Sequence, residues 1–345
     1  MLTCAEEKGY WASYRWRAMG CTVEVLLGAA AEHDLLGRWA VGELERLEQS
    51  WSRFRPDSEL RRINARTGEM VALSDELADA VDTAAELWRL TDGVFDPTVH
   101  DALCAWGYDR DFGAVRADET LRRRRGPRPV PAPGLSGLVS VRRGTTGQEI
   151  GAAGGGRLLR SPAAIDLGGI GKGLAADRLA EGLLERGARS VLVAVGGDLR
   201  AEGTTPAGGW RSSLEDPFAD GVELLPVRFE RGALVASTTV LRRWSLADAA
   251  AHHLIDPTTG APAHPDLAAV FLSGTAAAWA EGLAKAALVL GAERGAALLA
   301  RVATLRPGWV TGAWFLTVDR RLVPVTDLSS NRHGAPPAPS ALGAA

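Results

Sequence analysis

The residues best suited to chemistry form a glycine-rich loop with one lysine, residues 166–173 (D-L-G-G-I-G-K-G). Glycine lets a backbone approach a ligand closely, a helix start attracts anions through its free N–H groups, and Lys172 adds a positive point charge. The spacing matches neither common phosphate motif: Gly173 stands where a P-loop has Ser or Thr, and the third glycine comes one residue too early for the dinucleotide fingerprint. Spacing alone leaves a phosphate site and a tight structural turn equally open, and Asp166 is either a ligand-binding carboxylate or a helix cap.

A second candidate is the pair His252-His253, followed by Asp256. A histidine three residues from an acid suits general acid–base work near neutral pH, so we take His253 and Asp256 as candidates to assist an attacking hydroxyl. Neighbouring histidines on a strand point to opposite faces, so joint metal ligation is not expected. A plain structural turn is the alternative.

Three further segments contain polar residues within a predicted turn, loop or helix. A strand opens into the turn Gly196-Gly197-Asp198, and an acidic loop spans 91–99. Glu281 and Lys285 have the i, i+4 spacing of a helical ion pair. Each of the three also fits a purely structural role.

The elements around these segments do not follow a βαβ rhythm. Strand-like stretches are expected at 14–27, 163–167, 190–195, 223–229, 233–238 and 270–273, with a closing hairpin at 310–318 and 321–325. Helices are expected at 31–50, 74–90 (with Ser74 as N-cap) and 170–184, and one or two more over 275–299. The pattern predicts an α+β fold with helices packed on mostly antiparallel sheets.

Bulk properties narrow the class of protein. A chain of 345 residues suits one large domain or two fused ones. A net charge of -3 argues against a protein built to coat nucleic acid or anionic membrane. The longest apolar stretch is broken by charges, so no membrane span is expected. Three cysteines without a C-x-x-C pair, and a start without an apolar signal region, predict a cytoplasmic protein.

Taken together, the segments resemble the ApbE-like family, the FAD:protein FMN transferases. The resemblance rests on six motifs in family order: Met19-Gly20-Cys21, 52–60 (S-R-F-R-P-D-S-E-L), 93–99 (G-V-F-D-P-T-V), 166–173, Gly196-Gly197-Asp198 and 253–260 (H-L-I-D-P-T-T-G). It implies one T-fold-related α+β domain over 14–328, with two lobes allowed around a variable Gly/Pro/Arg-rich seam near 113–160. Residues 1–13 are then an N-terminal extension and 330–345 a disordered tail.

The resemblance also implies an activity. Family members move the FMN moiety of FAD to a Thr or Ser hydroxyl of a target flavoprotein, form a phosphoester bond, release AMP and use Mg²⁺. Such chemistry needs positive charge or backbone donors on the phosphates and a base near the attacking hydroxyl. An FAD pyrophosphatase that yields FMN and AMP, and a non-catalytic flavin-binding protein, remain alternatives.

Site residues follow from the resemblance position by position. The implied FAD contacts are Met19, Phe54, Val94, Phe95, Asp96, Asp166, Lys172, Gly197, Asp198, His253 and Leu254. The implied metal positions are the backbone carbonyl of Gly169 and the side chains of Glu281 and Lys285.

Lys285 departs from the family pattern. At positions 281 and 285 the family has an Asp and a Thr as magnesium ligands. Glutamate can replace aspartate as an oxygen ligand, but a protonated lysine cannot coordinate a cation. The sequence therefore predicts a weaker or altered magnesium requirement. A second departure, at 236–239 and the following Arg242, is expected to shape the site for the target protein.

Overall fold

The structure is a computed structural model that describes residues 11–28, 33–142, 157–206, 208–247, 249–326 and 328. The predicted tail at 330–345 and the first ten residues lie outside the described residues. The first strand begins at Trp11, within the stretch predicted as an N-terminal extension.

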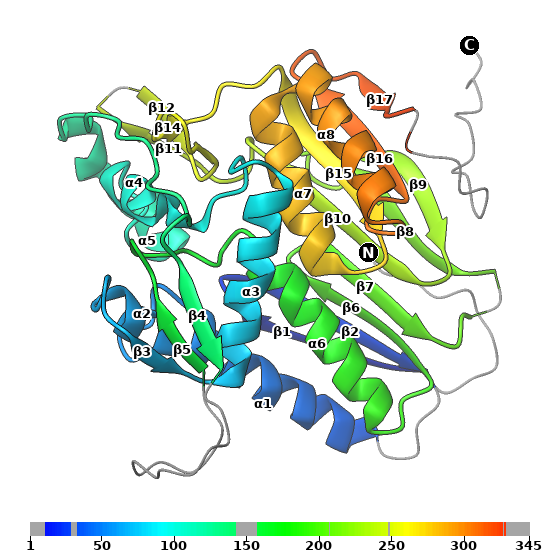
Figure 1. Ribbon diagram of the computed structural model, residues 1–345. Helices are drawn as coiled ribbons and strands as arrows, with labels where there is room; N and C mark the ends of the chain where they lie inside the picture. Colours follow the sequence, from blue (N-terminus) through cyan, green and yellow to red (C-terminus); the bar gives the residue numbers. More distant parts are fainter. Residues whose placement is uncertain are drawn as a thin grey trace, which may run out of the picture.

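An antiparallel sheet of eight strands forms the centre of the molecule (Figure 1). All seven neighbouring pairs in it are antiparallel. In spatial order the strands are β1 (Trp11–Ala18), β2 (Cys21–Gly28), β6 (Ser190–Val195), β7 (Asp198–Gly203), β10 (Gly232–Thr238), β15 (Leu267–Gly274), β16 (Gly312–Thr317) and β17 (Leu322–Pro324). The sheet and its helices confirm the predicted α+β class.

Five helices form a layer on one face of this sheet (Figure 1). They are α1 (His33–Trp51), α3 (Asp75–Leu90), α6 (Gly171–Glu185), α7 (Ala277–Leu290) and α8 (Ala292–Leu305). Helix α3 begins as predicted, because the hydroxyl of Ser74 accepts a hydrogen bond from the Leu77 backbone N–H at 3.2 Å. The predicted 275–299 region forms two helices, which Gly291 separates with a φ of 81°.

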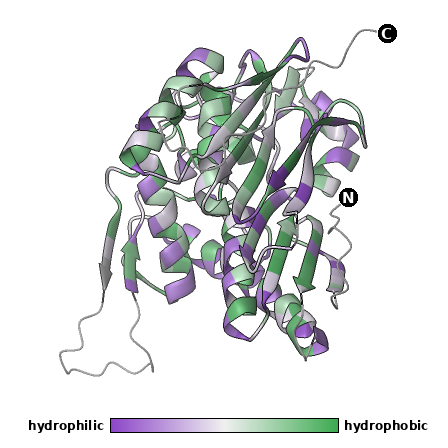
Figure 2. Cartoon of the chain, turned by 90° about the vertical axis from the view of Figure 1, so that its right-hand side faces the viewer, coloured by the Kyte–Doolittle hydropathy of each residue, from purple (hydrophilic) through white to green (hydrophobic). Residues whose placement is uncertain are grey.

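The opposite face of the sheet is covered in part by a hairpin of β8 (Trp210–Glu215) and β9 (Glu223–Phe229). Strand β6 is almost entirely apolar because both of its faces are buried. Val191, Val193 and Val195 join the core beneath the helices, whereas Leu192 and Ala194 join the core beneath the hairpin. The hydropathy colouring shows the resulting hydrophobic stretches along the central strands (Figure 2).

A small lobe at the upper left of Figure 1 has its own apolar cluster. It contains α4 (His100–Ala105), α5 (Phe112–Ala117), the 3₁₀ helix η2 (Glu119–Arg123), and the short strands β11 (Arg243–Leu246), β12 (Ala249–His252), β13 (Ile255–Asp256) and β14 (Ala261–Pro262). Below it in Figure 1 lie α2 (Glu59–Asn64) and a three-stranded sheet of β3 (Val71–Leu73), β5 (Arg157–Arg160) and β4 (Val139–Arg142). The 3₁₀ helix η1 (Pro97–Val99) leads directly into α4.

Two predicted strands were wrong in detail. The strand expected at 14–27 is the hairpin of β1 and β2, because Met19 and Gly20 turn the chain with φ values of 50° and 67°. The stretch 163–167 is extended but forms no strand. Its backbone pairs with the side-chain amide of Asn64 and with the carbonyl of Pro97 instead of with a neighbouring strand.

Among the helices of the described ranges, none is both long enough and apolar enough to cross a lipid bilayer.

Candidate active site

A cavity of about 460 Å³ lies where the helical layer meets the small lobe. It is lined by every predicted FAD-contact residue except Gly197 and Asp198, and by two of the predicted metal positions, Gly169 and Lys285. Its wall is formed by six segments: the turn at Met19, the segment after α1, the loop before η1, the glycine loop, the segment after β12 and helix α7. Segments far apart in the sequence therefore meet at one site.

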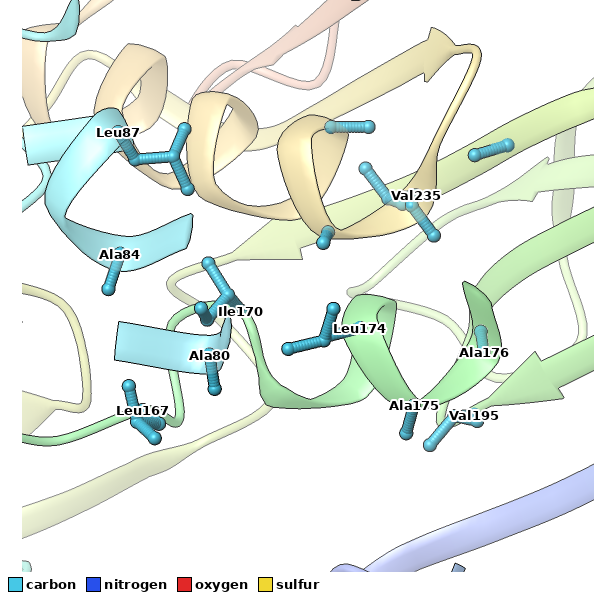
Figure 3. Close-up of a cluster of buried hydrophobic side chains, with 14 of the residues drawn as sticks. Ala80, Ala84, Leu87, Leu167, Ile170, Leu174, Ala175, Ala176, Val195 and Val235 are labelled. Atoms are coloured by element: carbon cyan, nitrogen blue, oxygen red, sulfur yellow. The ribbon is translucent and has the colours of Figure 1, made fainter. Parts of the chain in front are cut away.

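The glycine loop is held in place by its two apolar residues. Leu167 and Ile170 are buried in the core beside Ala80, Ala84 and Leu87 of α3 (Figure 3). The glycines between and after them remain at the cavity wall. The loop thus combines apolar anchors with bare backbone on the ligand side.

Asp166 organises this loop. Its carboxylate accepts a hydrogen bond from the Gly168 N–H at 2.5 Å and pairs with Nε of Arg53 at 2.7 Å. Both charged side chains are less than a tenth exposed. The Arg53 guanidinium also lies over the rings of Phe54 and Tyr108, 4.1 and 4.5 Å from their centroids. Arg53 belongs to the motif at 52–60 but was not among the predicted site residues.

Four charged side chains form a buried cluster at one end of the cavity. Lys172 pairs with Asp198 and lies 3.1 Å from Glu281 Oε1, and Lys285 Nζ donates to the same oxygen at 2.7 Å. The other oxygen, Oε2, accepts the Gly173 N–H at 2.7 Å. Burial acts to raise the pKa of Glu281, but the two ammonium groups hold it below its usual value. Burial raises the pKa of Asp198 and lowers that of Lys285, and in each case the opposite charges of the neighbouring groups act against the shift. These four side chains, called here the lysine–carboxylate cluster, pair two lysines with two acids.

The close contact of α6 with α7 fixes the geometry of this cluster. A Cβ on Gly173 would lie 2.4 Å from the backbone oxygen of Ala277, so only glycine permits the approach. Asp177 of α6 accepts the N–H groups of Ala277 and Ala278, both at 2.9 Å. It caps the start of α7 in this way and also pairs with Arg200 at 3.0 Å. Asp177 was not among the predicted site residues, although it lies in the same helix as Lys172.

The donor set at the predicted metal position does not fit a magnesium ion. Magnesium requires oxygen ligands in near-octahedral order. Here both oxygens of Glu281 already accept hydrogen bonds, and an ammonium group stands at position 285. In the described part of the chain, no three His, Cys, Asp or Glu side chains gather as a metal site.

Of the two residues predicted to assist an attacking hydroxyl, His253 lines the cavity and Asp256 does not. Asp256 ends β13, and its carboxylate accepts the Thr258 N–H at 2.9 Å and hydroxyl at 2.7 Å in the turn that leads to β14. The structure thus places Asp256 as a cap of its own turn, outside the cavity lining. Burial, and then the charges of Arg242 and Lys285, lower the pKa of His253 well below its usual value, so its imidazole is neutral at pH 7.

The neighbouring histidine is structural. His252 is buried, its Nε2 lies 2.8 Å from the carbonyl of Ala263, and its Nδ1 accepts the Leu254 N–H at 3.2 Å. Burial lowers its pKa to about 4. His252 therefore supports the cavity segment without entering the cavity.

Asp96 and Asp198 were predicted to contact FAD, but the carboxylate of each is engaged by neighbouring protein groups. Asp96 lines the cavity, yet its carboxylate accepts bonds from Thr98 and from Trp88 Nε1, and burial raises its pKa. Asp198 is fully buried behind Lys172 and reaches the cavity only through that lysine. Gly197 lies in the exposed β6–β7 turn, outside the cavity lining.

Part of the cavity wall is aromatic. The ring of Tyr108 lies 5.6 Å from that of Phe54 and 6.1 Å from that of Phe112, and its hydroxyl accepts a hydrogen bond from Arg242 at 3.0 Å. Within the described ranges, no carboxylate forms an ion pair with Arg242. Tyr108 and Phe112 were not predicted, although the aromatic spacing of Trp106, Tyr108 and Phe112 is visible in the sequence. The cavity wall thus combines aromatic rings with cationic side chains.

This arrangement can be compared with known proteins. The model of the ApbE family matches residues 19–306, which span nearly all of the described structure. The chain belongs to the ApbE family. The matched range includes every motif around the cavity, and it confirms the resemblance found in the sequence. This ApbE chain is therefore an enzyme, because its family relatives are named as transferases.

Individual relatives agree with the family assignment. A FAD:protein FMN transferase from Vibrio cholerae is 30% identical over 262 residues, which are 74% of this ApbE chain and 73% of the relative. Another, from Treponema pallidum, is 28% identical over 81% of this chain and 76% of the relative. The ApbE protein of Thermotoga maritima superimposes with a TM-score of 0.72 at 22% identity, covering 92% of this chain and 97% of that one. That last likeness establishes the ApbE fold.

Proposed function

We propose that this chain transfers the FMN moiety of FAD to a threonine or serine hydroxyl of a target flavoprotein. The observation that carries the proposal is one cavity whose wall combines aromatic rings with the ammonium groups of the lysine–carboxylate cluster. FAD contains the matching chemical parts, two ring systems and the charged pyrophosphate that joins them. The names of the curated relatives support the same reaction.

The proposed reaction exchanges a phosphoanhydride bond for a phosphoester bond. The acceptor hydroxyl oxygen attacks the phosphorus of the FMN half, a new P–O bond forms, and the anhydride P–O bond breaks. AMP leaves with the electron pair of that bond, and the hydroxyl proton passes to a base or to water. Lys172 would offset the negative charge that develops on the pyrophosphate.

The cavity residues are suited to two different parts of FAD, a ring system and the pyrophosphate. We propose that Phe54, Val94 and Phe95 contact a ring system, and that Lys172 faces the pyrophosphate. The remaining proposed contacts are Met19, Asp96, Asp166, His253 and Leu254. The proposed reaction does not use a metal ion, because the side chains at positions 281 and 285 do not fit one.

His253 is the proposed group that accepts the hydroxyl proton. It lines the cavity, it is neutral at pH 7, and its buried Nδ1 has no hydrogen-bond partner among the described residues. Replacing His253 by Ala should slow AMP release at saturating FAD by about 10²–10⁴-fold, the usual contribution of a general base. The exposed His264 provides the control, because His264→Ala should leave the rate unchanged. An unchanged rate for His253→Ala would remove this residue from the chemistry.

The experiment that tests the function uses FAD and a candidate flavoprotein encoded by the same genome. Mass spectrometry should find the acceptor heavier by one FMN less one water, together with an equal amount of AMP. The acceptor whose candidate threonine is replaced by Ala should gain no mass. AMP without an adduct would make the chain an FAD pyrophosphatase, and bound FAD with neither product would make it a flavin-binding protein.

A further inference from the structure

The lysine–carboxylate cluster has two faces of opposite charge. Lys172 and Lys285 belong to the cavity lining, whereas Asp198 and Glu281 lie behind them and are nearly inaccessible. The side chain of Lys172 is 20% exposed and that of Lys285 is 12% exposed, whereas the two carboxylate side chains are each 1% exposed. A ligand in the cavity therefore meets cations, with the compensating acids withheld from it.

The hydrogen bonds leave no room for a divalent ion within this cluster. Oε1 of Glu281 receives two ammonium groups, at 2.7 Å from Lys285 and 3.1 Å from Lys172, and Oε2 receives the Gly173 N–H. Two ammonium groups already balance two carboxylates. A magnesium ion would add two positive charges next to Lys285, whose own charge repels it.

The position of Lys285 is fixed by the packing of α7 against α6. It projects from α7 one turn after Glu281, and α7 is held against α6 by the glycine contact at Gly173 and by the Asp177 cap. Its Nζ donates to Glu281 Oε1 at 2.7 Å, the oxygen that Lys172 also approaches. The Lys285 amine is thus held in place at the cavity wall, within reach of the same ligand as Lys172.

We propose that the Lys285 ammonium stands in for a divalent cation, so that this chain binds the pyrophosphate of FAD and releases AMP without magnesium. The inference rests on the proposed function. It concerns only how charge is supplied: Lys172 and Lys285 together offset the negative charge of the phosphates and of the departing AMP. The bonds that form and break are those given above, and no metal-bound species takes part.

The test compares wild type with Lys285→Thr, both stripped of metal and assayed in EDTA and in excess Mg²⁺. The variant restores a neutral oxygen that can serve as a metal ligand and removes the ammonium. Wild type should release AMP at the same rate in both conditions. Lys285→Thr should be slower by about 10²-fold in EDTA, the typical effect of losing one transition-state electrostatic contact, and should recover in Mg²⁺.

Lys285→Met is the matched control. It removes the charge without supplying an oxygen, so it should be slow in EDTA and stay slow in Mg²⁺. Thermal unfolding of all three proteins identifies any variant that does not fold. A wild type that loses activity in EDTA and regains it fully in Mg²⁺ would overturn the proposal.

Binding gives a readout that does not depend on turnover. FAD titrations followed by flavin fluorescence should give wild type the same Kd in EDTA and in Mg²⁺, whereas Lys285→Thr should bind FAD more weakly in EDTA and recover in Mg²⁺. If no preparation forms AMP, the proposed function fails, but these titrations still decide the role of Lys285. A wild-type Kd that tightens tenfold or more on adding Mg²⁺ would contradict it.

Discussion

Replacing Lys172 by methionine is expected to slow FMN transfer strongly and to weaken FAD binding. Lys172 is the cavity-facing cation that both buried acids of the cluster share. Removing a preorganised charge that faces the reacting phosphate costs about 10²–10³-fold in rate. Single-turnover AMP release with saturating FAD measures this loss, and a rate within a few-fold of wild type would show that Lys172 does not face the pyrophosphate.

The same substitution should also destabilise the fold. Without Lys172, the only remaining partner of the Asp198 carboxylate in the described structure is the Ala236 N–H at 3.4 Å. An uncompensated buried charge costs about 3–5 kcal/mol. The double variant Lys172→Met with Asp198→Asn removes that charge, so it should regain most of the free energy of unfolding and none of the activity. Recovery of activity in the double variant would place the role of Lys172 in folding alone.

Replacing Asp177 by alanine should give the largest loss of stability outside the cavity. Its carboxylate accepts two backbone N–H groups at the start of α7 and pairs with Arg200, and it is 6% exposed. Loss of these buried contacts is expected to lower the free energy of unfolding by about 3–5 kcal/mol. Urea denaturation of the purified variant measures the change.

Two controls interpret the Asp177 result. Asp177→Asn keeps an acceptor oxygen and should lose less stability than Asp177→Ala. Asp79 pairs with Arg178 on an exposed part of the same helical layer, so Asp79→Ala should change stability by about 0–1 kcal/mol. If Asp177→Ala loses no more than Asp79→Ala, the α6–α7 contact does not depend on the cap. Because α7 carries Glu281 and Lys285, the Asp177→Ala protein should also bind FAD more weakly.

Local patterns in the sequence predicted the regular elements well. The Ser74 cap, the apolar run of β6 and the α7–α8 region each follow from periodicity or capping that short-range physics decides. The strand predicted at 163–167 failed for the opposite reason. Its residues have strand-like character, but their backbone partners are Asn64 and Pro97, which lie far away in the sequence.

The site could be predicted where a motif brings its own residues together. The glycine loop, Lys172, Phe95 and His253 all reach the cavity as expected. The contacts between motifs could not be predicted in the same way. Asp256 satisfies its own turn, and only the fold shows that Arg53 neutralises Asp166. Spacing along a chain gives no information on such partners, because packing of the α6–α7 pair and the small lobe brings them together.

The proposed transfer is tested most directly by following, by mass spectrometry over time, a candidate flavoprotein incubated with FAD and either wild type or the Lys172→Met variant. Wild type should add one FMN less one water to the acceptor and release an equal amount of AMP. The variant should form the adduct about 10²–10³-fold more slowly, and an acceptor lacking its candidate threonine should give no adduct. Adduct formation by Lys172→Met at the wild-type rate would contradict the site, and AMP from wild type without any adduct would contradict the transfer.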